Sequence, residues 1–150
     1  MTKVEVRNLR GTQLMGVARD HALIFDKTVE GGGTGLGINA SELFLFSLGA
    51  CMTFNLLQYA ATHKMKIREI RVDLSDEQQS SPNRINKVKA QVHISGEVND
   101  DELLRLLRSA KGCKIHNTLK AVPEVEVSVH KAGPQPKDLL DTDKHRFSMC

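Results

Sequence analysis

The chain has 150 residues, which is enough for one domain with a hydrophobic core and too few for two. Hydrophobic residues make up 40% of it and charged residues 26%, an ordinary globular composition. The net charge of +3 is small, and only 4% of the residues are aromatic. This balance excludes the basic patches and stacking platforms of nucleic-acid-binding proteins, so we expect no nucleic-acid partner.

Three short strands are expected near the start of the chain. Residues 2–9 alternate polar and apolar side chains, as a half-buried strand does. Residues 12–18 and 21–25 predict two more strands, with Arg19 and Asp20 in the turn that joins them.

A glycine-rich segment, residues 31–37, follows these strands. It lacks the G-x-G-x-x-G spacing of dinucleotide-binding loops and the Lys-Ser/Thr pair of phosphate loops. We interpret it as a flexible loop that leads into a helix. Asn39 and Ser41 are both suitable N-caps, and Glu42 stands in capping-box position relative to Asn39.

The longest apolar segment predicts a central helix from about residue 40 to residue 63. Its stretch from Leu43 to Thr62 carries no formal charge and is about as long as the ~20 residues that cross a bilayer. A helix that is apolar on all sides is buried either in a protein core or in a membrane. We favour a core helix and expect no membrane span, because lipid disfavours the polar side chains in this segment: Ser47, Thr53, Asn55 and Gln58.

Two more strands are predicted after this helix. Residues 67–74 and 88–98 alternate polar and apolar side chains. The segment between them, residues 76–86, is mostly polar, so we interpret it as a hairpin-like connection.

A second, amphipathic helix follows, with Asn99 as its N-cap, acidic residues in its first turn and Gly112 at its end. Residues 125–129 predict a last strand. Strands on both sides of two helices, without strict alternation, indicate an α+β fold in which antiparallel sheets wrap around the long apolar helix. We assign residues 1–131 to this domain and residues 132–150 to a surface-draped or disordered extension.

The chain has three cysteines, Cys51, Cys113 and Cys150. Its first twenty residues lack the apolar region of a secretory signal, so we expect a reducing, cytoplasmic location. In that compartment structural disulfides are rare, and cysteines are more often catalytic, metal-binding or inert.

Taken alone, each cysteine has more than one interpretation. A cysteine buried in the apolar helix, as Cys51 is expected to be, behaves as a small hydrophobe. Cys113 is expected near the start of a helical turn, where backbone N–H groups favour a thiolate. A zinc site is the alternative, since Cys113 and His116 form a close pair of ligands and Cys51 or His63 would supply more. The sequence offers no second close-spaced pair of ligands, so we expect no metal.

Two motifs surround the cysteines. The first, NASELFLFSLGAC, is entered from the glycine-rich loop and ends at Cys51; the second, KGCKIHNTL, contains Cys113. Together they resemble the OsmC/Ohr family of osmotically induced and organic hydroperoxide resistance proteins, over about residues 1–131. The resemblance implies an intertwined homodimer with active sites at the subunit interface. It also implies that Cys51 reduces an organic hydroperoxide, that Cys113 closes a disulfide onto it, and that an external dithiol, such as a lipoyl group, restores both thiols without a bound cofactor.

Arginine and glutamate residues complete the site in this family, where the arginine holds the reactive thiolate. Arg19 resembles that arginine, although its turn lacks the family's glycines, and Glu42 stands one residue after the usual glutamate position. The two cysteines meet a chemical need, because a sulfenic acid is overoxidised unless a second thiol condenses with it. The apolar residues around Cys51 favour organic hydroperoxides over hydrogen peroxide. The alternative is a member without catalysis, which serves as a redox sensor or an apolar-ligand-binding dimer.

Overall fold

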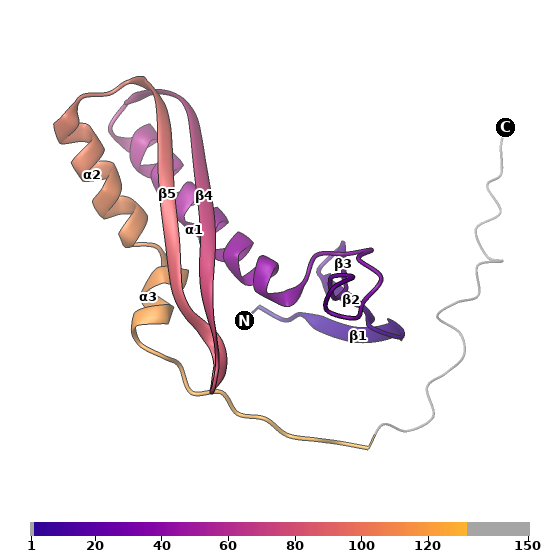
Figure 1. Ribbon diagram of the computed structural model, residues 1–150. Coiled ribbons are helices and arrows are strands. Elements are labelled where there is room, and N and C mark those ends of the chain that lie inside the picture. Colours follow the sequence, from indigo (N-terminus) through magenta and orange to yellow (C-terminus); the bar gives the residue numbers. More distant parts are fainter. Residues whose placement is uncertain (1, 132–150) are drawn as a thin grey trace, which may run out of the picture.

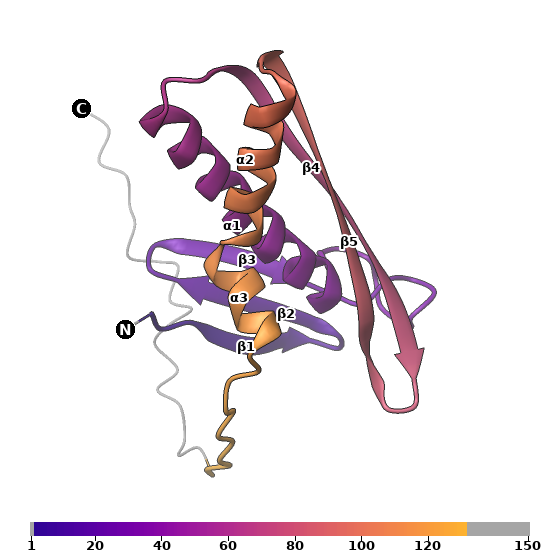
Figure 2. The ribbon, with the colours of Figure 1, turned by 90° about the vertical axis from the view of Figure 1, so that its left-hand side faces the viewer.

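The computed structural model describes residues 2–131 and has an α+β architecture, as the sequence predicts (Figure 1). Two antiparallel sheets and two shorter helices are arranged around a long central helix, α1 (Ala40–Thr62). A three-stranded sheet lies at the N-terminal end of α1, and a long two-stranded hairpin runs along it (Figure 1). The other two helices pack on α1 beside this hairpin (Figure 2).

The three-stranded sheet has the order β1 (Glu5–Arg10), β2 (Gln13–Ala18) and β3 (His21–Phe25). Both pairings are antiparallel, and Ala18 pairs with His21. Arg19 and Asp20 therefore form a two-residue turn, as predicted.

The glycine-rich segment after β3 is more ordered than the flexible loop that we expected. The buried carboxylate of Asp26 holds this segment in place. It accepts hydrogen bonds from the Thr12 hydroxyl at 2.6 Å and from the Thr34 hydroxyl. The backbone N–H groups of Lys27, Thr34 and Leu36 also donate to it, at 2.8, 3.0 and 3.3 Å. The glycines permit the tight path, since an added Cβ at Gly33 would lie 2.2 Å from the Lys27 carbonyl oxygen. The segment is thus wrapped around one buried anion.

The limits of α1 agree with the prediction to within one residue, because local signals set them. Asn39 accepts a hydrogen bond from the Glu42 N–H at 2.9 Å, and the Glu42 carboxylate accepts one from the Asn39 N–H at 2.7 Å. This is the predicted capping box. Beyond the last residue, Thr62, and the C-cap, His63, the chain turns at Lys64, which has a positive φ, and the Met65 N–H donates to the Ala60 carbonyl at 2.9 Å.

Only one face of α1 is buried in the single chain, which differs from the helix buried on all sides that we expected. Its buried side chains recur every fourth residue and form one stripe: Leu48, Met52, Leu56 and Ala60. On other faces Phe46 is 63% exposed and Phe54 is 70% exposed. By length and composition α1 also meets the criteria for a membrane-crossing helix.

The hairpin of β4 (Lys66–Ser80) and β5 (Asn83–Glu97) is longer than predicted. The polar segment that we interpreted as a connection is mostly strand, and only Ser81 and Pro82 form the turn. Cross-strand ion pairs stabilise it, including Lys89 to Glu77 at 2.7 Å. The outer part of the hairpin lacks the polar–apolar alternation by which we predicted strands, because both of its faces are solvated.

Two helices complete the described chain: α2 (Asp100–Lys111), with a second capping box formed by Asn99 and Glu102, and α3 (Lys114–Lys120). The strand predicted over residues 125–129 is absent from the described part of the chain. Those residues are extended and exposed, with Val129 at 94%, because no strand of this single chain lies beside them to pair with. The domain boundary at residue 131 stays a prediction, and the extension with Cys150 lies outside the described residues.

Candidate active site

The two motif cysteines lie together, although they are far apart in the sequence. Cys113 is fully buried against Leu48 and Met52 of the α1 stripe, and the half-buried Cys51 packs on the same cluster. Residues of β4, β5 and α3 close the cluster: Val72, Leu74, Val88 and Ile115. The packing of α3 on the middle of α1 therefore brings one accessible and one inaccessible thiol into contact.

Close approach of the hairpin to α1 helps to enclose this pair. At Gly49 an added Cβ would lie only 2.7 Å from Leu74 Cδ1 of β4. A larger residue at this position, two residues before Cys51, would require the Leu74 side chain to move. Gly49 thus belongs to the support of the site, a role that our sequence reasoning missed.

Cys113 is the N-cap residue of α3, and its Sγ accepts a hydrogen bond from the His116 N–H at 3.4 Å. Burial raises the pKa of the Cys113 thiol, and the nearby Cys51 sulfur raises it further, although the His116 N–H acts in the opposite direction. These shifts favour the protonated form of Cys113. The pair is asymmetric, because Cys51 is partly exposed and Cys113 is fully buried.

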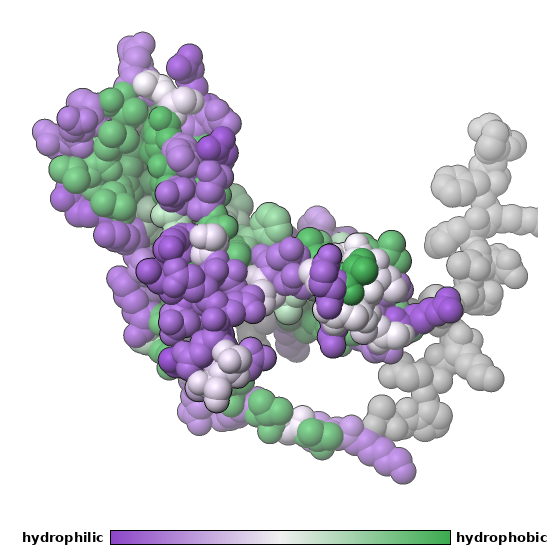
Figure 3. Space-filling model, in the orientation of Figure 1, coloured by the Kyte–Doolittle hydropathy of each residue, from purple (hydrophilic) through white to green (hydrophobic). Residues whose placement is uncertain are grey.

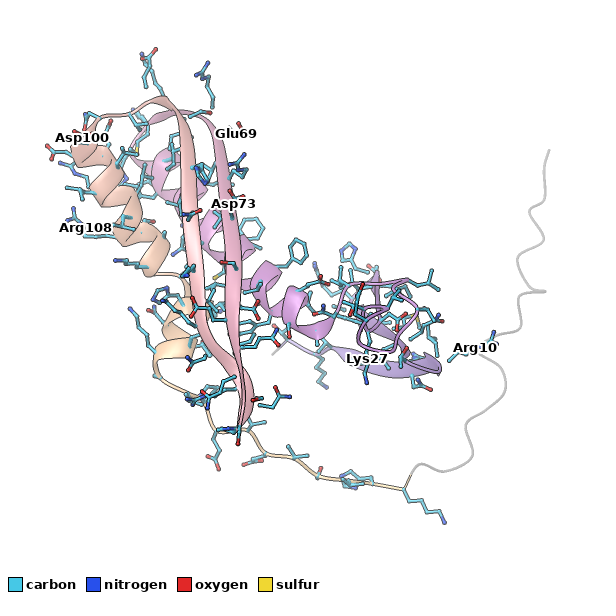
Figure 4. All side chains as sticks on the ribbon, viewed as in Figure 1. Arg10, Lys27, Glu69, Asp73, Asp100 and Arg108 are labelled. Carbon is cyan, nitrogen blue, oxygen red and sulfur yellow. The ribbon has the colours of Figure 1, made fainter. Side chains whose placement is uncertain are left out.

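A groove of about 720 Å³ lies beside this pair, between α1 and β4. It runs past Ala50, the residue before Cys51, and its walls are mainly apolar, with Leu45, Phe46 and Leu74 among them. Two carboxylates also line it, those of Glu42 and of Asp73, which Figure 4 labels on β4. Asp73 is paired with Arg71 at 3.2 Å and with His93 at 3.1 Å. The groove can hold an apolar molecule against the helix that carries Cys51, although neither cysteine is among the residues that line it.

The structure places the other two predicted site residues apart from the thiols. Arg19 is exposed at the β2–β3 turn, where its φ of 55° lies in the left-handed region. Among residues 2–131, its side chain makes no hydrogen bond or ion pair. The carboxylate of Glu42 is engaged by the Asn39 N–H in the capping box. Within this single chain the expected arginine–glutamate pair is therefore not formed.

The zinc alternative rests on Cys113 and His116. In residues 2–131 no three side chains of metal-ligating type come together. Cys113 and His116 do share one turn, but the turn is stabilised by the backbone of His116, which donates to the cysteine sulfur.

Solved structures share this fold. An OsmC-like protein from Mycoplasma pneumoniae matches with a TM-score of 0.74 and 15% identity, over 81% of this chain and 89% of that one. An organic hydroperoxide resistance protein OsmC from Legionella pneumophila matches with a TM-score of 0.64 and 22% identity, over 81% and 90%. The organic hydroperoxide resistance protein OhrB of Bacillus subtilis matches with a TM-score of 0.57 and 21% identity, over 81% and 92%. At these identities the likeness shows the fold alone. In a separate comparison, no curated protein matches the sequence.

The family assignment rests on a direct sequence match. The family model described as OsmC-like protein matches residues 32–128, which include the glycine-rich loop, both cysteines and the extended segment after α3. The OsmC-like fold is a soluble domain, so α1 is best interpreted as its core helix. The motifs around Cys51 and Cys113, the shared architecture and this match agree: the chain belongs to the OsmC-like protein family.

Proposed function

We propose that the protein is a thiol-dependent peroxide reductase that acts on organic hydroperoxides. The observation that carries this proposal is the contact between the half-buried Cys51 and the fully buried, protonated Cys113. A peroxidase of this kind needs one thiol that the peroxide can reach and a second thiol that waits beside it. Family members named for organic hydroperoxide resistance support the same substrate class.

The reaction proceeds in three steps. The Cys51 thiolate attacks one peroxide oxygen, the O–O bond breaks, Cys51 becomes a sulfenic acid, and the other oxygen leaves as the alcohol after taking up a proton. The Cys113 thiol then attacks the sulfenic sulfur, the S–O bond breaks and water leaves, which forms a Cys51–Cys113 disulfide. An external dithiol reduces the disulfide by exchange and is itself oxidised. The apolar groove beside Ala50 would hold the organic part of the peroxide.

A cation near Cys51 is the remaining need, because a partly buried thiolate is costly without one. We assign this role to Arg19, whose guanidinium stays charged at any working pH. Its φ of 55° costs conformational energy, and such strain is often found at functional positions. Glu42 would orient the guanidinium, from its place in the lining of the groove.

The same proposal includes a homodimer. Phe46 and Phe54 of α1 and the valines after α3 leave more apolar surface exposed than a stable monomer carries. A second copy would cover α1 and give residues 125–129 a strand to pair with. Sedimentation is expected to show a dimer, and Phe54→Glu should dissociate it because the charge would be buried in the interface. A wild-type chain that sediments as a monomer at micromolar concentration would contradict this part.

Peroxide consumption tests the function. Purified protein with tert-butyl hydroperoxide and dihydrolipoamide should turn over many times, and Cys51→Ser should abolish turnover without a change in the circular dichroism spectrum. Cys150→Ser is the matched control and should keep full activity. A redox sensor would instead form the disulfide once and show no turnover with the dithiol. Near-normal turnover in Cys51→Ser would refute the assignment of the nucleophile.

A cytoplasmic location, where such dithiols are kept reduced, is part of the proposal.

A further inference from the structure

A second pocket lies on the other side of the Leu48–Met52 stripe, between α1, β5, α2 and α3. Its volume is about 340 Å³, within the range of roughly 300–1,000 Å³ that small-molecule sites occupy. The floor is apolar and comes from α1, β5 and α2: Leu48, Met52, Val88, Ala90, Val92 and Ala110. Leu107 and Leu119, each more than two-fifths exposed, stand at its mouth. In Figure 3 hydrophobic surface gathers over the α2 side of the molecule.

The polar groups of this pocket are all basic. They are Lys111 from the last turn of α2 and His116 and Lys120 from α3, and no described Asp or Glu lines the pocket. The acidic residues of α2 are at its opposite end, where Figure 4 labels Asp100. Burial lowers the pKa of His116, and the charges of Lys120 and Lys111 lower it further. Lys111 and Lys120 therefore create one region of positive potential, and His116, whose charged form they disfavour, adds a ring N–H rather than a charge.

Helix dipoles alone do not account for this arrangement. A lysine in the last turn of a helix is favourable by itself, which explains Lys111 and Lys120 separately. The dipoles do not explain why both lysines and a half-buried imidazole meet at the rim of one apolar pocket. An anionic head joined to an apolar tail would use the rim and the floor together.

We propose that this pocket binds a monocarboxylic acid with a linear apolar tail. The tail packs on Met52, Val92 and the neighbouring floor, and the carboxylate lies at Lys111, His116 and Lys120. The site is separate from the groove beside Cys51 and requires no redox chemistry. The proposal for this pocket can therefore be tested independently of peroxide reduction.

Calorimetry on the reduced full-length protein, without peroxide, tests the proposal with octanoate as the probe. Hexanoate should bind about fifteenfold more weakly than octanoate, because each buried methylene contributes about fourfold in affinity. Lys111→Gln and Lys120→Gln should each weaken octanoate binding by up to about fivefold, the range for exposed charge pairs. Neither change should affect 1-octanol, which has the tail without the charge.

Matched variants complete the design. Lys114→Gln removes the same charge from α3 at a position outside the pocket and should leave octanoate affinity unchanged. Ala90→Phe fills the pocket from β5 and should abolish binding, and a strand tolerates the aromatic residue. Leu107→Glu, at an exposed position, should repel the carboxylate and serves if Ala90→Phe does not fold.

Three results would overturn the proposal. The first is the absence of saturable octanoate binding in the wild-type protein. The second is equal binding of octanoate and 1-octanol, or equal weakening by Lys114→Gln and Lys111→Gln, since either would mean that the rim does not recognise the carboxylate. The third is a combined result: the wild-type protein does not bind octanoate, and Leu107→Glu dissociates an oligomer. This result would mean that the pocket is covered by a second copy of the chain.

Discussion

Glu42 has two candidate roles, a helix cap and a catalytic orienting group, and matched substitutions separate them. In the structure its carboxylate accepts a hydrogen bond from the Asn39 N–H at 2.7 Å and lies in the first turn of α1. Glu42→Gln keeps this hydrogen bond and removes the charge, which should cost only the dipole contribution of about 0.3–1 kcal/mol. Glu42→Ala also removes the hydrogen bond, so the total loss should be about 1–2 kcal/mol.

The chain contains its own control, because α2 begins with the same capping box. There Glu102 accepts from the Asn99 N–H at 2.9 Å, and the Glu102 N–H donates to Asn99 at 2.9 Å. Glu102→Gln and Glu102→Ala should therefore cost the same stability as the changes at Glu42. Urea denaturation measures all four free energies of unfolding, and peroxide consumption with dihydrolipoamide measures the activities.

If Glu42 orients Arg19, Glu42→Gln should lower kcat/KM about tenfold or more, since a small misplacement of a catalytic group is costly. Glu102→Gln should leave kcat/KM unchanged at an equal stability. Full activity of Glu42→Gln would refute the orienting role and leave Glu42 as a helix cap alone. Equal losses of activity in Glu42→Gln and Glu102→Gln would show that the effect is one of stability.

Three further outcomes follow from particular residues. Arg19→Ala should slow both peroxide turnover and iodoacetamide labelling of Cys51 at pH 7; unchanged rates would mean that another cation serves the thiolate. Lys64→Gly should raise the free energy of unfolding by about 1 kcal/mol, because Lys64 holds a φ of 52° that glycine adopts without cost; no gain in urea denaturation would contradict this. Hydrogen bonds from Thr12, then Thr34 and the loop N–H groups hold the pKa of Asp26 well below its usual value of 3.8. The unfolded chain therefore binds the proton first, so this stabilisation is complete above about pH 4 and is lost as the pH falls below it. Thermal melts should show that Asp26→Asn is less stable at pH 7 and loses less stability on acidification; an unchanged acid response would refute the argument.

Short-range signals in the sequence were sufficient for many of the elements. Both capping boxes, at Asn39 and at Asn99, are local patterns of four residues, so the starts of α1 and α2 were predicted correctly. The turn at Arg19 was found because two alternating segments flank it. The cysteine motifs identified the family, which the match over residues 32–128 confirms.

Tertiary structure decided what depends on neighbours distant in the chain. The outer part of the β4–β5 hairpin has no buried face and hence no hydrophobic period, so only its pairing revealed Glu77 and Lys87 as strand residues. Residues 125–129 have the strand pattern, but a strand also needs a partner, and none lies beside them in one chain. Contact between Cys51 and Cys113 arises from the packing of α3 on α1, which no local pattern specifies. The buried Asp26 was missed for the same reason, because its donors, from Thr12 to Leu36, converge only when the loop folds around it.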